Sequence, residues 1–304
     1  MILCFQWFPR RKGLINGLIV GGFGLGAIVS TNIQTYYLNP NNVSPDSDGF
    51  FTDDAVLDRV PTLFLVIGFV YILVEYVGCM LISKPSKDVE TKILAEPADE
   101  GSIEGNDPCS VSEDLTPKRL LRQRTFYVFW FTFLFLGIAI SYISAMGKSF
   151  GQTFISDDHF LAQIVSFAAL FNAGGRILWG RIMDKTSFRL SMRMLCTIFT
   201  VLLATMPLTS YMGKIGYPIW IWLIYLTFSG AFSIMPTGTE KAFGSTHYSS
   251  NYGMVFSCQA ISGSLMAAVN ELMLDTFGYT GCFLTMAAIA SLGIGLTFLI
   301  PNGL

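Results

Sequence analysis

The stretch that decides the fold is AALFNAGGRILWGRIMDK, residues 168–185. It begins as an apolar run and places Arg176 inside that run, before the charged group Arg181, Asp184 and Lys185. The chain is 52% hydrophobic and only 13% charged, whereas soluble domains carry about 25% charged residues. This composition is typical of a membrane protein. A guanidinium inside a membrane helix is costly, so the position of Arg176 needs a structural or functional reason.

Working outward, the sequence contains eight apolar blocks, each near the roughly 20 residues that cross a ~30 Å hydrocarbon core. The predicted spans are 14–36, 60–82, 125–147, 159–179, 190–211, 218–237, 251–275 and 280–300. MILCFQWF at the start is similar to the end of a ninth span. A signal peptide is rejected because the charges of RRK follow this segment. The sequence therefore predicts an all-α polytopic membrane protein, and its start within half a span favours a fragment or a gene model without its first exons.

Lys and Arg set the predicted orientation. With PRRKG (9–13) inside, the connections 83–124, 180–193 and 238–250 are also inside, and the inner set holds fifteen basic residues against three outside. This bias follows the positive-inside rule, and Arg176 is the one basic residue left over from both sets. The sequon NNVS places a predicted glycosylation site, Asn42, on the outer side.

The inner connection 83–124 is rich in Glu, Asp, Ser and Pro and is predicted to be a disordered linker. Its basic end, KRLLRQR, has two interpretations. It is either a plain stop-transfer flank, which the sequence favours, or a short amphipathic helix on the anionic inner leaflet.

Several classes of function are excluded by the residue pattern. The chain has no nucleophile elbow, HExxH motif or paired carboxylates in a reaction pocket, so we expect neither an enzyme nor a cofactor. No metal site is expected, because the cysteines lack ligand spacing and the two histidines are predicted on opposite sides of the membrane. The basic residues are dispersed over inner turns, so nucleic acid is not an expected partner.

The glycine-rich segment GLINGLIVGGFGLGA, residues 13–27, lies inside a predicted span. A phosphate-binding loop would need a preceding strand. The spacings Gly17 to Gly21 and Gly22 to Gly26 instead match the small-xxx-small pattern that lets two membrane helices approach closely. We therefore predict a helix-packing face.

A family resemblance is carried by WFPRRKGLINGLIVGGFGLGA (7–27), QTYYLNPNN (34–42), FFTDDAVLDRVPTLF (50–64) and GRILWGRIMDK (175–185). These segments resemble the oxalate/formate antiporter and monocarboxylate transporter branch of the major facilitator superfamily. The resemblance implies a major facilitator fold lacking helices one to three. Residues 1–82 would be the remnant of the N-terminal six-helix half, with the end of helix four and helices five and six. Residues 83–124 would be the cytosolic central loop, and 125–304 the C-terminal half with helices seven to twelve.

The inner-loop signature of that family is matched by Gly180, Asp184, Lys185 and Arg189, with Ser187 in place of the second glycine. The resemblance implies a conformational latch, in which Asp184 at a helix end pairs with basic groups or backbone amides in one state and releases them in the other. The alternative is an ordinary charged inner turn.

Arg176 has two possible roles. From the residues alone, it either binds a ligand together with Asn172, four residues earlier on the same helical face, or snorkels to the inner surface. The two interpretations are balanced until the resemblance is considered. Arg176 is similar in place and spacing to the helix-eight arginine that binds the substrate carboxylate in this family, which favours the ligand role.

Two departures from the family pattern bear on the substrate. Proton-coupled monocarboxylate transporters have an aspartate at the position of Asn172, and oxalate/formate antiporters have a lysine at the position of Gln259. Asn172 cannot titrate, and a single cation suits a monoanion better than a dianion. Glu75 is the deepest acidic residue and is either a possible proton relay or a structural pair with a neighbouring helix.

Together these features predict a secondary active transporter of small organic monocarboxylates or related organic anions, working by alternating access. The alternative is a truncated, non-transporting membrane protein that associates with a full-length relative. The expected partners are a small organic anion and the lipid bilayer; an accessory membrane protein is possible but unknown. The plasma membrane is the expected location, with an organelle membrane as the second choice.

Overall fold

The computed structural model describes residues 7–8, 12–38, 40, 53–86, 114–155, 157–301 and 303. Within these residues every regular element is helical, which confirms the all-α prediction. The elements are, in order, α2 (Lys12–Leu38), α3 (Asp54–Leu57), α4 (Arg59–Leu81), α6 (Pro117–Leu120), α7 (Arg124–Gln152), α8 (Asp158–Lys185), α9 (Phe188–Thr205), η1 (Met206–Leu208), α10 (Thr209–Phe228), α11 (Ala231–Phe243), α12 (Tyr248–Phe256) and α13 (Cys258–Thr297).

Five helical segments of the described chain are long and apolar enough to cross a membrane. They are Asp54–Leu81, Arg124–Gln152, Phe188–Phe243, Tyr248–Asn270 and Leu272–Thr297. The 56-residue segment Phe188–Phe243 is interrupted at η1 and contains the predicted spans 190–211 and 218–237. The other two predicted spans, 14–36 and 159–179, fall on α2 and α8, which are not among these five segments.

Two glycines mark breaks inside long helices. Gly213 in α10 has φ +56° and Gly278 in α13 has φ +61°, and this left-handed conformation favours glycine because it has no Cβ. The break at Gly278 divides α13 close to the predicted boundary between the spans 251–275 and 280–300. The sequence therefore predicted the position of this turn correctly.

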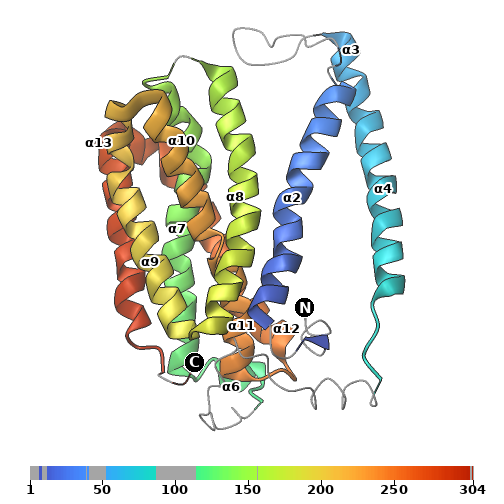
Figure 1. Ribbon diagram of the computed structural model, residues 1–304, viewed down its shortest axis with the longest axis vertical. Coiled ribbons are helices and arrows are strands. Elements are labelled where there is room, and N and C mark those ends of the chain that lie inside the picture. Colours follow the sequence, from blue (N-terminus) through green and yellow to red (C-terminus); the bar gives the residue numbers. More distant parts are fainter. Residues whose placement is uncertain are drawn as a thin grey trace.

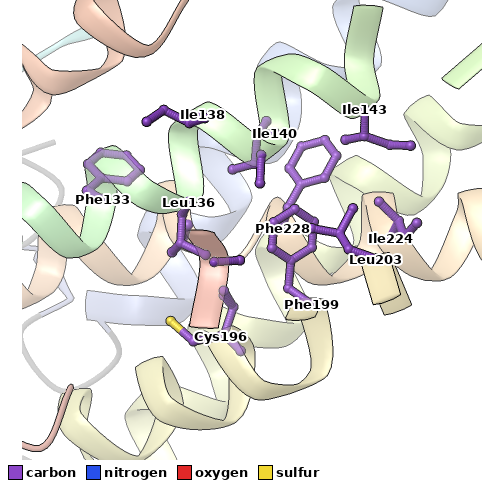
Figure 2. Close-up of a cluster of buried hydrophobic side chains, with 14 of the residues drawn as sticks. Phe133, Leu136, Ile138, Ile140, Ile143, Cys196, Phe199, Leu203, Ile224 and Phe228 are labelled. Carbon is purple, nitrogen blue, oxygen red and sulfur yellow. The ribbon is translucent and has the colours of Figure 1, made fainter. Parts of the chain in front are cut away.

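The helices α7 to α13 form a bundle, while α2 and α4 lie to one side of it, with α2 next to α8 (Figure 1). Inside the bundle, apolar side chains from α7, α9 and α10 meet in a continuous core (Figure 2). Phe199 of α9 and Phe228 of α10 lie edge to face in this core, with ring centroids 6.2 Å apart. A packed core of this kind fixes the helices on which the candidate site is built.

The contact between α2 and α8 is made through glycine. A Cβ at Gly17 would lie 2.3 Å from the carbonyl oxygen of Arg176, and a Cβ at Gly21 would lie 3.3 Å from that of Ala173. The predicted packing face is therefore confirmed at these two positions. At Gly22 and Gly26 an added Cβ would meet no described atom within 4 Å. The two helices are close at their lower ends in Figure 1 and separate toward their upper ends.

The last residues of the predicted disordered connection are ordered. The Leu115 amide donates to the Phe243 carbonyl at 3.0 Å, Asn251 Nδ2 donates to the Leu115 carbonyl at 2.9 Å, and Leu120 of α6 is fully buried. Residues 114–123 thus pack against the turn between α11 and α12. Sequence composition missed this because the acidic, polar part of 83–124 dominates the average. Residues 87–113 lie outside the described residues.

Candidate functional site

The candidate site is centred on Arg176, which α8 places at the contact with α2. The side chain is only 7% exposed, and its Nη1 atom donates a hydrogen bond to the Val20 carbonyl of α2 at 2.5 Å. The guanidinium carbon lies 5.4 Å from the centre of the Phe232 ring of α11. Arg176 therefore lies between three helices, with a polar partner on one side and an aromatic face on the other.

Two glycines allow α8 to approach its neighbours closely at this level. Gly17 of α2 packs on the backbone of Arg176 itself, as described above. On the opposite side, a Cβ at Gly175 would lie 2.2 Å from the Leu226 carbonyl and 2.3 Å from Ser229 Oγ, both at the end of α10. The backbone of α8 around Arg176 is thus held from both sides, which positions the guanidinium.

Two further polar contacts join α2 to the bundle near the same end. Asn16 is fully buried and its Nδ2 atom donates to the Ser233 carbonyl of α11 at 2.7 Å. The Leu14 amide, in the first turn of α2, donates to Asp184 Oδ2 at 2.7 Å. A carboxylate at a helix N-terminus is favourable because it meets free N–H groups and the positive end of the helix dipole.

The predicted latch residues occupy two different contacts. Gly180 is buried in α8 and Lys185 is exposed at its end, while Asp184 contacts α2. Arg189 of α9 instead donates from Nη2 to the Phe298 carbonyl at 3.2 Å, at the end of α13. The structure therefore brings Asp184 to the interface between α2 and α8, and Arg189 to the exposed C-terminal end of α13.

Asn172 lies one turn from Arg176 on α8 and is half-buried. Its Oδ1 atom is buried and accepts no hydrogen bond from any residue that the structure describes. The guanidinium of Arg176 donates to the Val20 carbonyl and not to Asn172 Oδ1. The two residues share a helical face, as their spacing predicted.

Gln259 faces α7. Its Nε2 atom donates to the Phe133 carbonyl at 3.1 Å, and its Oε1 atom lies 2.8 Å from where a Cβ on Gly137 would be. The amide thus occupies a space opened by a glycine on α7. The structure therefore places Gln259 in a helix contact, with its donor group bonded to the backbone.

Two other predicted residues lie away from Arg176 or outside the description. Glu75 is exposed on α4, a helix whose main contacts among the described elements are with α2 and α3. Asn42, the predicted glycosylation site, lies outside the described residues. Among the described residues no group of His, Cys, Asp and Glu is arranged to hold a metal ion.

Sequence reasoning missed three partners of Arg176: the Val20 carbonyl, Phe232 and Tyr252. Tyr252 of α12 lies in the neighbourhood of Arg176, and its ring stacks on that of Tyr248 with centroids 5.8 Å apart. The i, i+4 aromatic spacing from Tyr248 to Tyr252 was a usable signal. A backbone carbonyl carries no signal in a sequence.

Comparison with known proteins identifies the family. Residues 1–267 match the Major Facilitator Superfamily. The chain is 24% identical to apicoplast pyruvate carrier 1 of Toxoplasma gondii, over 99% of this chain and 61% of that protein. It is 23% identical to the oxalate:formate antiporter of Oxalobacter formigenes, over 98% of this chain and 64% of that protein. The chain thus spans about three-fifths of the length of these relatives. Since the family pattern covers most of the chain, and several helices are suited to a bilayer, this protein is a multi-pass integral membrane protein that belongs to the Major Facilitator Superfamily.

Proposed function

We propose that this protein is a secondary transporter of small organic monocarboxylates, that it works by alternating access, and that Arg176 binds the substrate carboxylate. The observation that carries the proposal is the burial of Arg176 at the contact between α2 and α8. A buried guanidinium offers planar, two-point hydrogen bonding to a carboxylate. The snorkelling alternative is less consistent with a side chain that is 7% exposed.

The proposed domain organisation assigns residues 1–82 to the N-terminal half of the carrier and 125–304 to the C-terminal half, with 83–124 as the connection. On this assignment α2 belongs to one half and α8 to the other. The contacts of Leu14, Asn16 and Val20 with α8 and α11 then join the two halves at the predicted inner side. This arrangement fits a state closed toward the inside.

In this proposal the Val20 carbonyl accepts the hydrogen bond of the Arg176 guanidinium until a substrate binds. A carboxylate oxygen is ionised and forms a stronger hydrogen bond with a guanidinium than a neutral carbonyl does. A bound carboxylate would therefore displace Val20 and remove one of the contacts between the halves. Asp184 would act as the latch, because its bond to the Leu14 amide lies at the same end of α2.

The preferred substrate is a monoanion. Arg176 is the one basic residue that the predicted topology assigns to neither the inner nor the outer connections, and the amide of Gln259 is already bonded to the Phe133 carbonyl. A second carboxylate would have no cation of its own and would carry a large desolvation cost. Asn172 cannot exchange a proton, so the Asn172 and Arg176 pair does not by itself couple transport to protons.

The test is uptake of lactate-sized and formate-sized monocarboxylates into proteoliposomes. Arg176→Ala should abolish uptake, and Arg176→Lys should reduce it at least about tenfold, because lysine keeps the charge but loses the planar fork. Arg181→Lys, at an exposed position on the same helix, is the matched control and should transport normally. Unchanged uptake by correctly inserted Arg176→Ala would refute the ligand role.

A second candidate is a non-transporting membrane protein that associates with a longer relative. It is favoured by α4, where only 6% of the most apolar window is buried. This candidate predicts no uptake by the purified chain under any condition, and uptake or altered uptake only when a longer relative is present. Robust uptake by the chain alone would exclude it.

A further inference from the structure

A patch of basic side chains lies at the predicted inner end of α7. Lys118, Arg119, Arg122 and Arg124 are all exposed, and they follow one another within and after the short helix α6. The sequence left two interpretations of this segment, a stop-transfer flank or a membrane-surface helix. The structure adds information on how the segment is held and on what lies beside it.

The segment is fixed to the bundle. Leu120 is fully buried between its basic neighbours, and the Leu115 amide bonds to the Phe243 carbonyl at 3.0 Å. The Tyr127 hydroxyl of α7 donates to the Leu121 carbonyl at 3.0 Å. These contacts orient the basic side chains outward. A plain stop-transfer flank would not need such anchoring.

Within residues 114–124 of the described chain, four basic side chains outnumber the one carboxylate, Asp114. Both carboxylate oxygens of Asp114 accept hydrogen bonds from Thr246, one from its amide and one from its hydroxyl. The first turn of α7 contains no acidic residue, and Gln123 provides no side-chain cap. The net charge of residues 114–124 is therefore positive, with a further positive contribution from the dipole of α7.

An exposed apolar surface continues directly from the patch. Arg124, Tyr127 and Phe131 follow the i, i+3, i+7 spacing of one helical face, and Tyr127 and Phe131 are 46% and 41% exposed. Leu121, beside Arg122, is 47% exposed. Cations at the end of a span followed by exposed aromatic and aliphatic groups match the two parts of a phospholipid, a charged head and apolar chains.

We propose that Lys118, Arg119, Arg122 and Arg124, with Leu121, Tyr127 and Phe131, form a binding site for one anionic phospholipid of the inner leaflet. The headgroup phosphate and carboxylate contact the basic side chains, and an acyl chain lies along the exposed face of α7. A small inorganic anion would use the cations alone and would gain nothing from the apolar face.

The experiment is native mass spectrometry of the delipidated chain titrated with phosphatidylserine and with phosphatidylcholine. The unmodified protein should retain phosphatidylserine preferentially. The double variant Arg122→Gln/Arg124→Gln should lose affinity for phosphatidylserine by about fivefold for each cation removed. Arg122→Lys/Arg124→Lys should restore the preference for phosphatidylserine. This variant also shows that the protein still folds when the two arginines are replaced.

The matched control is Arg181→Gln/Lys185→Gln, which removes the same charge from exposed positions on the same predicted side of the membrane. It should retain phosphatidylserine as the unmodified protein does. An equal loss in this control would show general charge attraction and overturn the proposal. Displacement of the lipid by inorganic phosphate at equal concentration would assign the site to a free anion instead, and would also overturn it.

Discussion

The helices α4 and α7 are both long and apolar, but the bundle buries them very differently. In the most apolar window of Asp54–Leu81 only 6% is buried, compared with 67% in Arg124–Gln152. Both segments were predicted as membrane spans from composition. The difference teaches that apolarity indicates where a helix lies, in the bilayer, but not which helix it contacts, because lipid tails are as apolar as leucine.

The helix α2 shows what does specify a contact. Its interface with α8 and α11 is made by Gly17, Gly21, the amide of Asn16 and the backbone of Leu14 and Val20. Small residues let backbones approach, and polar groups then find partners across the helices. By contrast, α4 presents Phe64, Leu65 and Leu81 at 71%, 75% and 77% exposure.

The largest expected effect compares equivalent truncations in the two helices. Phe133→Ala in α7 removes a ring that is fully buried and in contact with Phe232, with centroids 5.7 Å apart. We expect a loss of about 3–5 kcal/mol in unfolding free energy, because the cavity is lined by well-packed neighbours. Phe64→Ala in α4 should change it by less than about 0.5 kcal/mol. Thermal unfolding in detergent measures both, and equal losses would show that α4 is covered in the folded protein.

The next comparison lies within α2. Gly17→Ala would place a methyl group 2.3 Å from the Arg176 carbonyl, so α2 must move, whereas Gly22→Ala meets no described atom within 4 Å. We expect Gly17→Ala to cost about 1–3 kcal/mol at this contact and to displace Arg176. Cysteine cross-linking between the lower ends of α2 and α8 should fall in Gly17→Ala and remain in Gly22→Ala. If cross-linking instead falls in Gly22→Ala and remains in Gly17→Ala, the interface between α2 and α8 does not depend on the Gly17 contact.

How far the sequence predicts this molecule depends on the kind of feature. Apolar block length predicted the spans on α4 and α7, and glycine spacing predicted Gly17 and Gly21 as contact positions, because both properties are local. Gly22 and Gly26 have the same spacing but lie on another face of α2, about 100° around the helix from Gly21, and make no such contact. Which of the two glycine faces meets α8 depends on the packing of two helices distant in sequence.

The sequence likewise identifies the local features of the candidate site but not the contacts between distant segments. Arg176 was identified because a charge in an apolar run is conspicuous, and Asp184 because it follows a recognisable motif. One partner of Arg176 is a backbone carbonyl, and one partner of Asp184 is a backbone amide. Neither is encoded by residue type. Gln259 was predicted from the resemblance, but its amide is bonded to α7 because Gly137 opens space there.

A smaller effect is expected at the end of α2. Asp184→Asn keeps an oxygen that can accept the hydrogen bond of the Leu14 amide but removes the negative charge at the helix N-terminus. The contact should weaken by about 0.3–1 kcal/mol. Protease or thiol-reagent access to the lower ends of α2 and α8 should rise by a few fold. Arg189→Gln, which loses a contact with the Phe298 carbonyl in the bundle, should leave this access unchanged. Similar access in both variants would contradict a specific role for Asp184.

The smallest expected effect is a dependence on pH at the end of the connection, where Asp114 lies against Thr246. The side-chain hydrogen bond from Thr246 lowers the pKa of the Asp114 carboxyl below its ordinary value of about 3.9, and the Thr246 amide adds to this effect. Because the pKa of the folded state is lowered, this contact contributes stability above the ordinary pKa and loses it only as the pH falls through the lowered value. The protection of the Leu115 amide, which bonds to the Phe243 carbonyl, is measured as its exchange rate relative to that of an unfolded amide at the same pH. This protection should therefore be the same at pH 8 and pH 5 and should fall only in strong acid. Thr246→Val removes the largest cause of the shift, so the fall in protection should begin at a higher pH, while Asp114→Asn should show no such step. If protection in the unmodified chain already falls near pH 5, the Thr246 contact does not hold the carboxylate in its ionised form.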